Sequence, residues 1–306
     1  MRRLCALLSL IVSAMPARVF AHGTVGDYTF LEPMVAEDAN PKNEFDILRP
    51  QYLWTREGRQ FSLGFSLEKV LINAPEDTAF WPADSPLVSL EIGSGWSHLS
   101  PRGEAALSGF EGLELFPKWA FLTVPEHQLR LSLAAALVLP TGSPSTEEQN
   151  HTLLGPVLLW AKGWGDLPNR GLLKYLRPFG FQGDVGYVPA LGGAAWHEMF
   201  ADNVIEYSLP YLSNHVKDIG LRWPLRNLYV YTEFNYDQLI TGPPGEPFPE
   251  ILITPGIAFM GRYLQLSVAT RFALNRASVR DNQATLIGLV DLFIDDILPW
   301  ANWTPM

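Results

Sequence analysis

The run from residue 60 to residue 68 alternates bulky apolar residues with small or polar ones without a break. Successive side chains of an extended strand point to opposite faces. Phe61, Leu63, Phe65 and Leu67 therefore form one apolar surface, and the other face is small or polar. Such a strand has to place its apolar face against a protein core or against lipid.

The same two-residue period recurs along the chain. It is clear at 88–97, 128–139, 228–237 and 263–273. Weaker candidate strands lie at 47–56, 105–115, 153–162, 176–187, 204–212, 251–260 and 284–293. Connectors rich in Pro, Gly, Asp and Asn separate them. The pattern predicts about 12 strands in a single domain.

The first 21 residues have the pattern of an export signal. Arg2 and Arg3 form its positive end, residues 4–14 its apolar core, and Val19-Phe20-Ala21 its cleavage site. The alternative is an uncleaved anchor, but the apolar core is shorter than the about 20 residues that a spanning helix needs. Cys5 is the only cysteine and lies in this segment, so the mature chain would have no disulfide and no cysteine metal ligand.

The charge balance is acidic. The chain has 22 Lys and Arg against 32 Asp and Glu, a formal net charge of −10. A chain with this balance lacks the basic surface that nucleic-acid binding requires. We therefore expect no nucleic-acid partner.

Two architectures explain many alternating strands. In a soluble β-sandwich the apolar faces meet in a core, and in a transmembrane barrel they meet lipid. The strands are long enough to cross a bilayer, which takes about 9–11 tilted residues. Their polar faces are rich in Ser, Gly, Ala and Gln and carry few lysines, which suits a confined interior. We therefore expect an all-β fold, an antiparallel up-and-down transmembrane β-barrel that follows an N-terminal signal peptide.

The expected division of the chain follows from this fold. Residues 1–21 form the signal peptide and residues 22–45 a periplasmic N-terminal segment. The barrel spans residues 46–294, and residues 295–306 form a C-terminal tail. Barrels commonly end in an aromatic residue, whereas this chain ends in Met306. Phe293 would serve as an internal version of that signal, but Asp291 falls where a lipid-facing residue is expected.

Charged side chains on the lipid face would cost about 2–4 kcal/mol at mid-depth, so the charged strand residues should point inward. The predicted polar residues of the lumen are Glu68, Glu91, Arg130, Glu233, Asn235, Asp237, Gln265 and Arg271. Two interpretations are open. These residues tie the wall together and plug the barrel, or they form a polar path that sets selectivity.

The segment from Gly26 to Asp38 resembles the start of an outer-membrane, transporter-like β-barrel family linked to the meta-cleavage pathway of phenol degradation. In that family a Pro-apolar-Val-Thr-acid-Asp stretch follows the signal. The matching residues are Pro33, Met34, Val35, Glu37 and Asp38, and Ala36 replaces the usual hydroxyl residue. The end of the chain, from Phe293 to Pro299, is similar too. The resemblance implies an outer-membrane barrel that passes small molecules, aromatic ones among them, and it supplies no catalytic residues.

Few residues form a pattern that points to chemistry. A mature chain starting at His22 could bind copper through its amine and ring, but no spacing selects the second histidine that this needs. His197-Glu198 lacks the second histidine of a zinc protease helix, because Ala201 stands four residues after His197. Ser97 and His98 are neighbours in a strand and point to opposite faces. We expect no cofactor, no metal beyond this weak His22 candidate, and no catalytic residues.

The sequence thus predicts an outer-membrane barrel acting as a passive channel or transporter for small molecules, hydrophobic or aromatic ones among them, rather than an enzyme. Its expected partners are outer-membrane lipid, the barrel assembly machinery and a small solute. Two alternatives stay open: a secreted β-sandwich binding protein, and an outer-membrane lipid or ester hydrolase. Strand pairing would separate the first alternative from the barrel, and a converging Ser and His would indicate the second.

Overall fold

The computed structural model describes residues 23–144, 151–192, 197–241 and 249–301. The expected signal peptide and His22 lie outside the described residues, as do residues 302–306 of the expected tail. The preceding residues of the tail form a helical turn α4 (Ile294–Ile297) and a short 3-10 turn at Pro299–Ala301.

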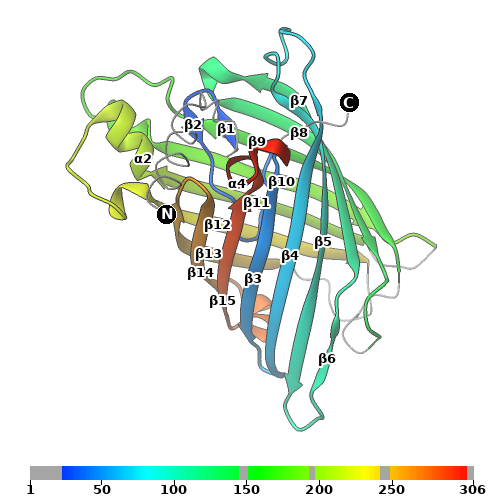
Figure 1. The fold of residues 1–306 in the computed structure, drawn as a ribbon. Helices are drawn as coiled ribbons and strands as arrows, with labels where there is room; N and C mark the ends of the chain where they lie inside the picture. Colours follow the sequence, from blue (N-terminus) through cyan, green and yellow to red (C-terminus); the bar gives the residue numbers. More distant parts are fainter. Residues whose placement is uncertain (1–22, 145–150, 193–196, 242–248, 302–306) are drawn as a thin grey trace, which may run out of the picture.

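Twelve long antiparallel strands form a closed barrel (Figure 1). They are β3 (Glu44–Trp54), β4 (Gly58–Asn73), β5 (Pro86–Pro101), β7 (Leu113–Val124), β8 (Leu129–Leu139), β9 (Leu153–Gly163), β10 (Phe179–Pro189), β11 (His197–Ser208), β12 (Leu228–Thr241), β13 (Glu250–Met260), β14 (Leu264–Ala273) and β15 (Ala284–Phe293). Each strand pairs with its neighbours in sequence, and β15 pairs with β3 to close the ring. The predicted twelve-stranded barrel is confirmed, and the β-sandwich alternative is wrong because the strands form one closed sheet.

The remaining elements are short. They include the hairpin strands β1 (Thr24–Val25) and β2 (Tyr28–Thr29), the strand β6 (Leu107–Phe110) beside β5, and the helical turns α2 (Leu209–Tyr211) and α3 (Ser278–Asp281). Short 3-10 turns lie at Pro125–His127, Leu173–Leu176 and Leu225–Asn227, and a π-helical turn at Leu212–Val216 follows α2. Within the described ranges, no helix has the length and apolar character to cross a membrane.

The outer face of the barrel is apolar. Phe65 and Leu67 of the first alternating run are 45% and 48% exposed, and Glu68 beside them is buried. The same division holds on β12 and β14, where Val230 and Val268 are exposed. A soluble surface would not keep a band of this kind in water, whereas a bilayer requires it.

One predicted strand was misplaced. The sequence favoured a strand at 105–115, but the barrel strand β7 runs from Leu113 to Val124 and only 107–110 pair as β6. Pro117 and Lys118 obscured β7, because proline and a lysine are unusual in a central strand. Lys118 is tolerated there because its side chain points inward and pairs with Asp38 and Glu68, with each nitrogen to oxygen distance 3.4 Å.

Residues 23–43, hereafter the plug, lie inside the barrel (Figure 1). They enter from the end of the barrel where β15 leads into α4, reach the middle of the lumen at Val35–Glu37 and return to begin β3. Tyr28, Leu31 and Met34 of the plug are at most 1% exposed. The plug therefore fills the half of the lumen nearer α4.

The inner wall is less polar than the alternation predicted. Leu31, Met34 and Ala36 pack on a cluster of inward residues that includes Tyr229, Tyr231, Ile287, Leu289 and Phe293. Apolar side chains can face inward here because the plug covers them. Asp291 also faces inward and is fully buried, so the lipid-facing position expected for it is wrong.

Candidate functional site

Wall side chains hold the plug by its backbone. The carboxylate of Glu233 accepts hydrogen bonds from the amides of Met34 (2.7 Å), Val35 (3.0 Å) and Ala36 (3.1 Å). Gln265 binds Glu32 in both directions: its Oε1 accepts from the Glu32 amide at 3.0 Å, and its Nε2 donates to the Glu32 carbonyl at 2.8 Å. Each is completely buried. A segment without a strand partner thus has its backbone groups satisfied by side chains.

Charged residues fix the return of the plug. Glu68 accepts from the Lys42 amide at 3.4 Å and from the Ser89 hydroxyl, and it pairs with Lys118. Arg130 donates from Nη1 to Asn40 Oδ1 at 3.0 Å. Four of the eight predicted lumen residues, Glu68, Arg130, Glu233 and Gln265, therefore contact the plug directly.

Other wall residues that the sequence did not single out also bind the plug, among them three on β10 and β11. The Glu206 carboxylate accepts from the Leu31 amide at 3.3 Å, and Gln182 Nε2 donates to the Leu31 carbonyl at 2.8 Å. Asp184 accepts from the Glu37 amide at 2.6 Å. All three lie on β10 and β11, where Gly183 interrupts the alternation. An inward polar residue between outward Phe181 and Val185 was the signal that could have revealed Asp184.

A cavity of about 490 Å³, hereafter the vestibule, lies on the other side of the plug's turn at Val35–Glu37. Its lining includes the other four predicted residues, Glu91, Asn235, Asp237 and Arg271. Among the described residues it carries nine carboxylates and two guanidinium groups. The carboxylates are Glu37, Glu91, Glu111, Glu114, Asp184, Glu198, Asp202, Asp237 and Glu250, and the guanidinium groups are Arg49 and Arg271.

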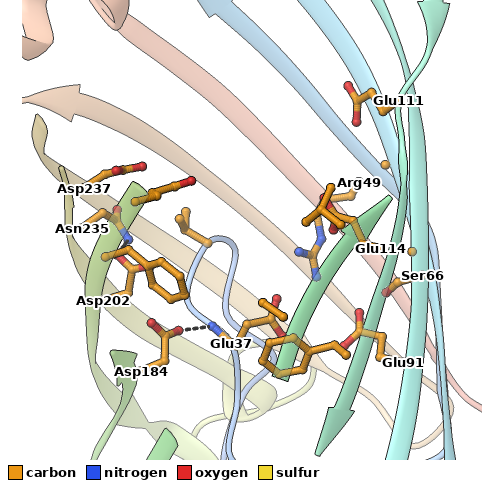
Figure 2. A pocket seen from close by; sticks show the side chains of 18 of the residues that line it. Glu37, Arg49, Ser66, Glu91, Glu111, Glu114, Asp184, Asp202, Asn235 and Asp237 are labelled. Carbon is orange, nitrogen blue, oxygen red and sulfur yellow. Dashed lines mark hydrogen bonds between the residues drawn. The ribbon is translucent and has the colours of Figure 1, made fainter. Parts of the chain in front are cut away.

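The charges of the vestibule lie on two facing walls (Figure 2). Glu91, Glu111 and Glu114 lie on the same side as Arg49, and Asp184, Asp202 and Asp237 lie opposite. The lining comes from the strand halves farther from α4, for example 198–202 of β11 and 235–237 of β12. A confined space with one sign of charge in excess concentrates counter-ions, here cations.

Glu37 forms part of the vestibule floor and belongs to the plug. Burial raises the pKa of its carboxyl from 4.5 to about 8, and the neighbouring Glu91 carboxylate adds to the rise, while Lys118 and Arg49 oppose it. The docked plug therefore holds a proton that a released plug would lose. Docking is strongest below pH 4.5, weakens as the pH rises towards about 8, and changes no further above it.

We expect the conductance of the protein to rise between pH 4.5 and about pH 8, as Glu37 loses its proton and the plug is held less tightly. Recordings from planar bilayers at a series of pH values measure this. Glu37→Gln should remove part of the rise, and Glu76→Gln, at an exposed connector position, should not. A rise that is the same in wild type and Glu37→Gln would contradict the assignment.

With this geometry in place, the fold can be compared with solved structures. An outer membrane channel from Pseudomonas putida F1 aligns over 86% of this chain and 99% of its own, with a TM-score of 0.52 and 12% identity. The outer membrane phospholipase A from Escherichia coli aligns over 85% of this chain and 94% of its own, at 9% identity and a TM-score of 0.40. The KdgM porin aligns over 80% and 97%, at 10% identity and a TM-score of 0.40. No family model and no curated protein matches the sequence.

The phospholipase and the porin, each with a TM-score of 0.40, are too dissimilar to support a conclusion about this chain. The similarity to the channel, at 12% identity, shows a shared fold and does not show a shared function. The chain is therefore a closed twelve-stranded barrel with the fold of an outer-membrane protein. The residues that line its own lumen determine what passes through it.

Proposed function

We propose that the protein is an outer-membrane channel that passes small solutes through an acidic lumen and prefers cations. The observation that carries this proposal is the vestibule, with nine carboxylates against two guanidinium groups around about 490 Å³. The apolar outer band supports a position in the bilayer. Export through the signal at 1–21, with residues 22–45 on the periplasmic side, stays a prediction.

The vestibule also suggests which solutes would fit. Its carboxylates lie beside apolar side chains, among them Phe116, Phe200 and Leu252. A small solute that joins a positive charge to an apolar ring would match both kinds of lining. Passage of neutral aromatic molecules and membership of the family linked to phenol degradation stay predictions from the sequence.

Uptake into vesicles tests the proposal. Purified protein would be reconstituted into liposomes, and swelling would be followed with small organic cations and with anions of the same size. We expect faster entry of the cations, and addition of high salt should reduce the difference because it screens the lining charges. Equal rates, or faster entry of anions, would contradict the proposed preference.

An ester hydrolase is the second candidate, and one observation favours it. His98 and Ser100 lie two residues apart on β5, so both point to the same face, and His98 Nε2 is 3.2 Å from Ser100 Oγ. The other ring nitrogen, Nδ1, is 2.7 Å from Ser108 Oγ on β6. This face carries the outward residues Phe61 and Trp96, so the pair would meet lipid or detergent esters.

In this alternative, Ser100 Oγ would attack an ester carbonyl while its proton moves to His98 Nε2 and then to the leaving alcohol. Water would release the acid from the acyl-enzyme. If the site acts in this way, a fluorophosphonate probe should label the folded protein, Ser100→Ala should abolish the labelling, and Ser94→Ala on the same strand should not. A wild-type protein that the probe does not label would rule out the hydrolase alternative.

A further inference from the structure

The seam that closes the barrel carries a cluster of carboxylates. Asp46 on β3 lies opposite Asp291 on β15, and Glu44, two residues before Asp46, points to the same side. The ladder between the two strands is irregular at Val290 and Asp291. Oxygen atoms of Glu44, Asp46 and Asp291 all lie within 4.8 Å of one another.

These three side chains are buried and have too few donors. Their exposed fractions are 5% for Glu44, 2% for Asp46 and 0% for Asp291. Within residues 23–144, 151–192, 197–241 and 249–301, no donor bonds to four of their six oxygens: Oε2 of Glu44, Oδ1 of Asp46, and both oxygens of Asp291. A buried carboxylate without donors is strongly destabilising unless a proton or a cation balances it.

Neighbouring cations do not balance the cluster. Lys42 lies between Glu32, Asp38 and Glu44, with its Nζ 3.0 Å from Asp38 and 2.7 Å from Glu44 Oε1. Arg49 pairs with Asp46 through Oδ2 and with Glu32 at 3.5 Å. Neither forms an ion pair with Asp291 in the described part of the chain.

A second acidic set nearby shows the contrast. Glu32, Asp38 and Glu44 also bring their oxygens within 4.8 Å of one another, but the ammonium group of Lys42 already contacts all three. The set of Glu44, Asp46 and Asp291 has no such cation at its centre, and the unpartnered oxygens of Asp291 point to a missing positive ligand.

We propose that Glu44, Asp46 and Asp291 bind a divalent cation, and that Ca²⁺ is the ion that fits. The ligands are all carboxylate oxygens, as hard cations prefer. Ca²⁺ accepts six to eight oxygens in an irregular arrangement, whereas Mg²⁺ demands near-ideal octahedral geometry and is bound through only one or two carboxylates, so three carboxylates at one point favour Ca²⁺. Water and the second oxygens of the carboxylates would complete the coordination.

The bound ion would join the first and last strands of the barrel and hold the residues where the plug turns into β3. It would thus stabilise closure of the ring. This proposal is independent of the cation preference of the vestibule, because Glu44, Asp46 and Asp291 are absent from the lining of that cavity.

The test is a calorimetric titration of the full-length mature protein in detergent, after treatment with EDTA, using CaCl₂ and separately MgCl₂. We expect a single Ca²⁺ per chain, weaker binding of Mg²⁺, and a higher unfolding temperature in Ca²⁺, followed by heat-dependent gel mobility. Asp291→Asn, which keeps the shape of the side chain, should weaken Ca²⁺ binding by at least about tenfold, because affinity follows the charge of the ligands.

Asp46→Asn serves as the second variant if Asp291→Asn fails to fold. Glu206→Gln is the matched control, since Glu206 is a buried carboxylate of β11 that accepts from the Leu31 amide, lies away from the seam and is absent from the lining of the vestibule. Its Ca²⁺ binding should equal that of the wild type. A wild-type protein that binds no Ca²⁺ at millimolar concentration would overturn the proposal and indicate shared protons instead. Binding that survives both seam substitutions would overturn it as well.

Discussion

Glu233→Leu is expected to release the plug's turn from the wall and raise the single-channel conductance severalfold. One carboxylate accepts hydrogen bonds from the amides of Met34, Val35 and Ala36. Leucine has a similar size and accepts none, so three buried donors lose their partner at about 1–3 kcal/mol each. The turn separates the vestibule from the opposite end of the lumen, so its release would widen the path.

Planar bilayer recordings measure this effect. The matched control is Thr254→Val, which removes a buried hydroxyl that bonds to Asn235 of the wall and leaves the plug untouched. Heat-dependent gel mobility would show that each barrel is folded. If a folded Glu233→Leu barrel conducts like the wild type, the plug does not limit passage.

Reversing two charges of the vestibule should lower the cation preference severalfold. Glu111 and Glu114 lie on one wall of the cavity (Figure 2), and neither contacts the plug through a hydrogen bond among the described residues. Glu111→Lys with Glu114→Lys would leave seven carboxylates against four cationic groups in the lining. Since a narrow space of low dielectric constant amplifies the field of its lining, the effect should be large at low salt and small at high salt.

Glu104→Lys is the control for this variant, because Glu104 is exposed between β5 and β6 and is absent from the lining of the cavity. The readout is the ratio of cation to anion entry in vesicles. A double variant with an unchanged ratio would show that selectivity is set elsewhere in the lumen.

The wall of the barrel was predictable because its signal is local. On β12 and β14, apolar and polar residues alternate, and these strands have Phe234 and Leu266 outside and Glu233 and Gln265 inside. The alternation of apolar and polar residues is hard to recognise where a residue of an unexpected type occupies an inward or outward position of a strand. Gly183 on β10 and Lys118 on β7 are examples, and the polar residues near them were missed for that reason.

The plug was not predictable in the same way. Residues 23–43 show no strand period and contain prolines, so the sequence predicts only a periplasmic N-terminal segment at 22–45 and not a plug in the lumen. Their backbone is satisfied by side chains far away in sequence, such as Glu233 for Met34 and Glu206 for Leu31. Long-range contacts of this kind leave no periodic pattern. The sequence did predict that Glu233 and Gln265 point inward, but not what they bind.

The eight predicted lumen residues fall into two groups, which match the two interpretations that the sequence left open. Glu68, Arg130, Glu233 and Gln265 hold the plug, whereas Glu91, Asn235, Asp237 and Arg271 line the vestibule. The interior thus has a structural half and an open half. Substitutions of the residues that hold the plug should change the conductance. Substitutions of the residues that line the vestibule should change the selectivity between solutes.

The reversal potential of the wild-type protein is a direct test of the proposed cation preference. The protein would be inserted into a planar bilayer that separates two concentrations of KCl, and the voltage at zero current would be measured. An open path lined by the vestibule's carboxylates should give a potential whose sign shows that K⁺ crosses more readily than Cl⁻. A potential of the opposite sign, or a folded barrel that carries no current, would contradict the account.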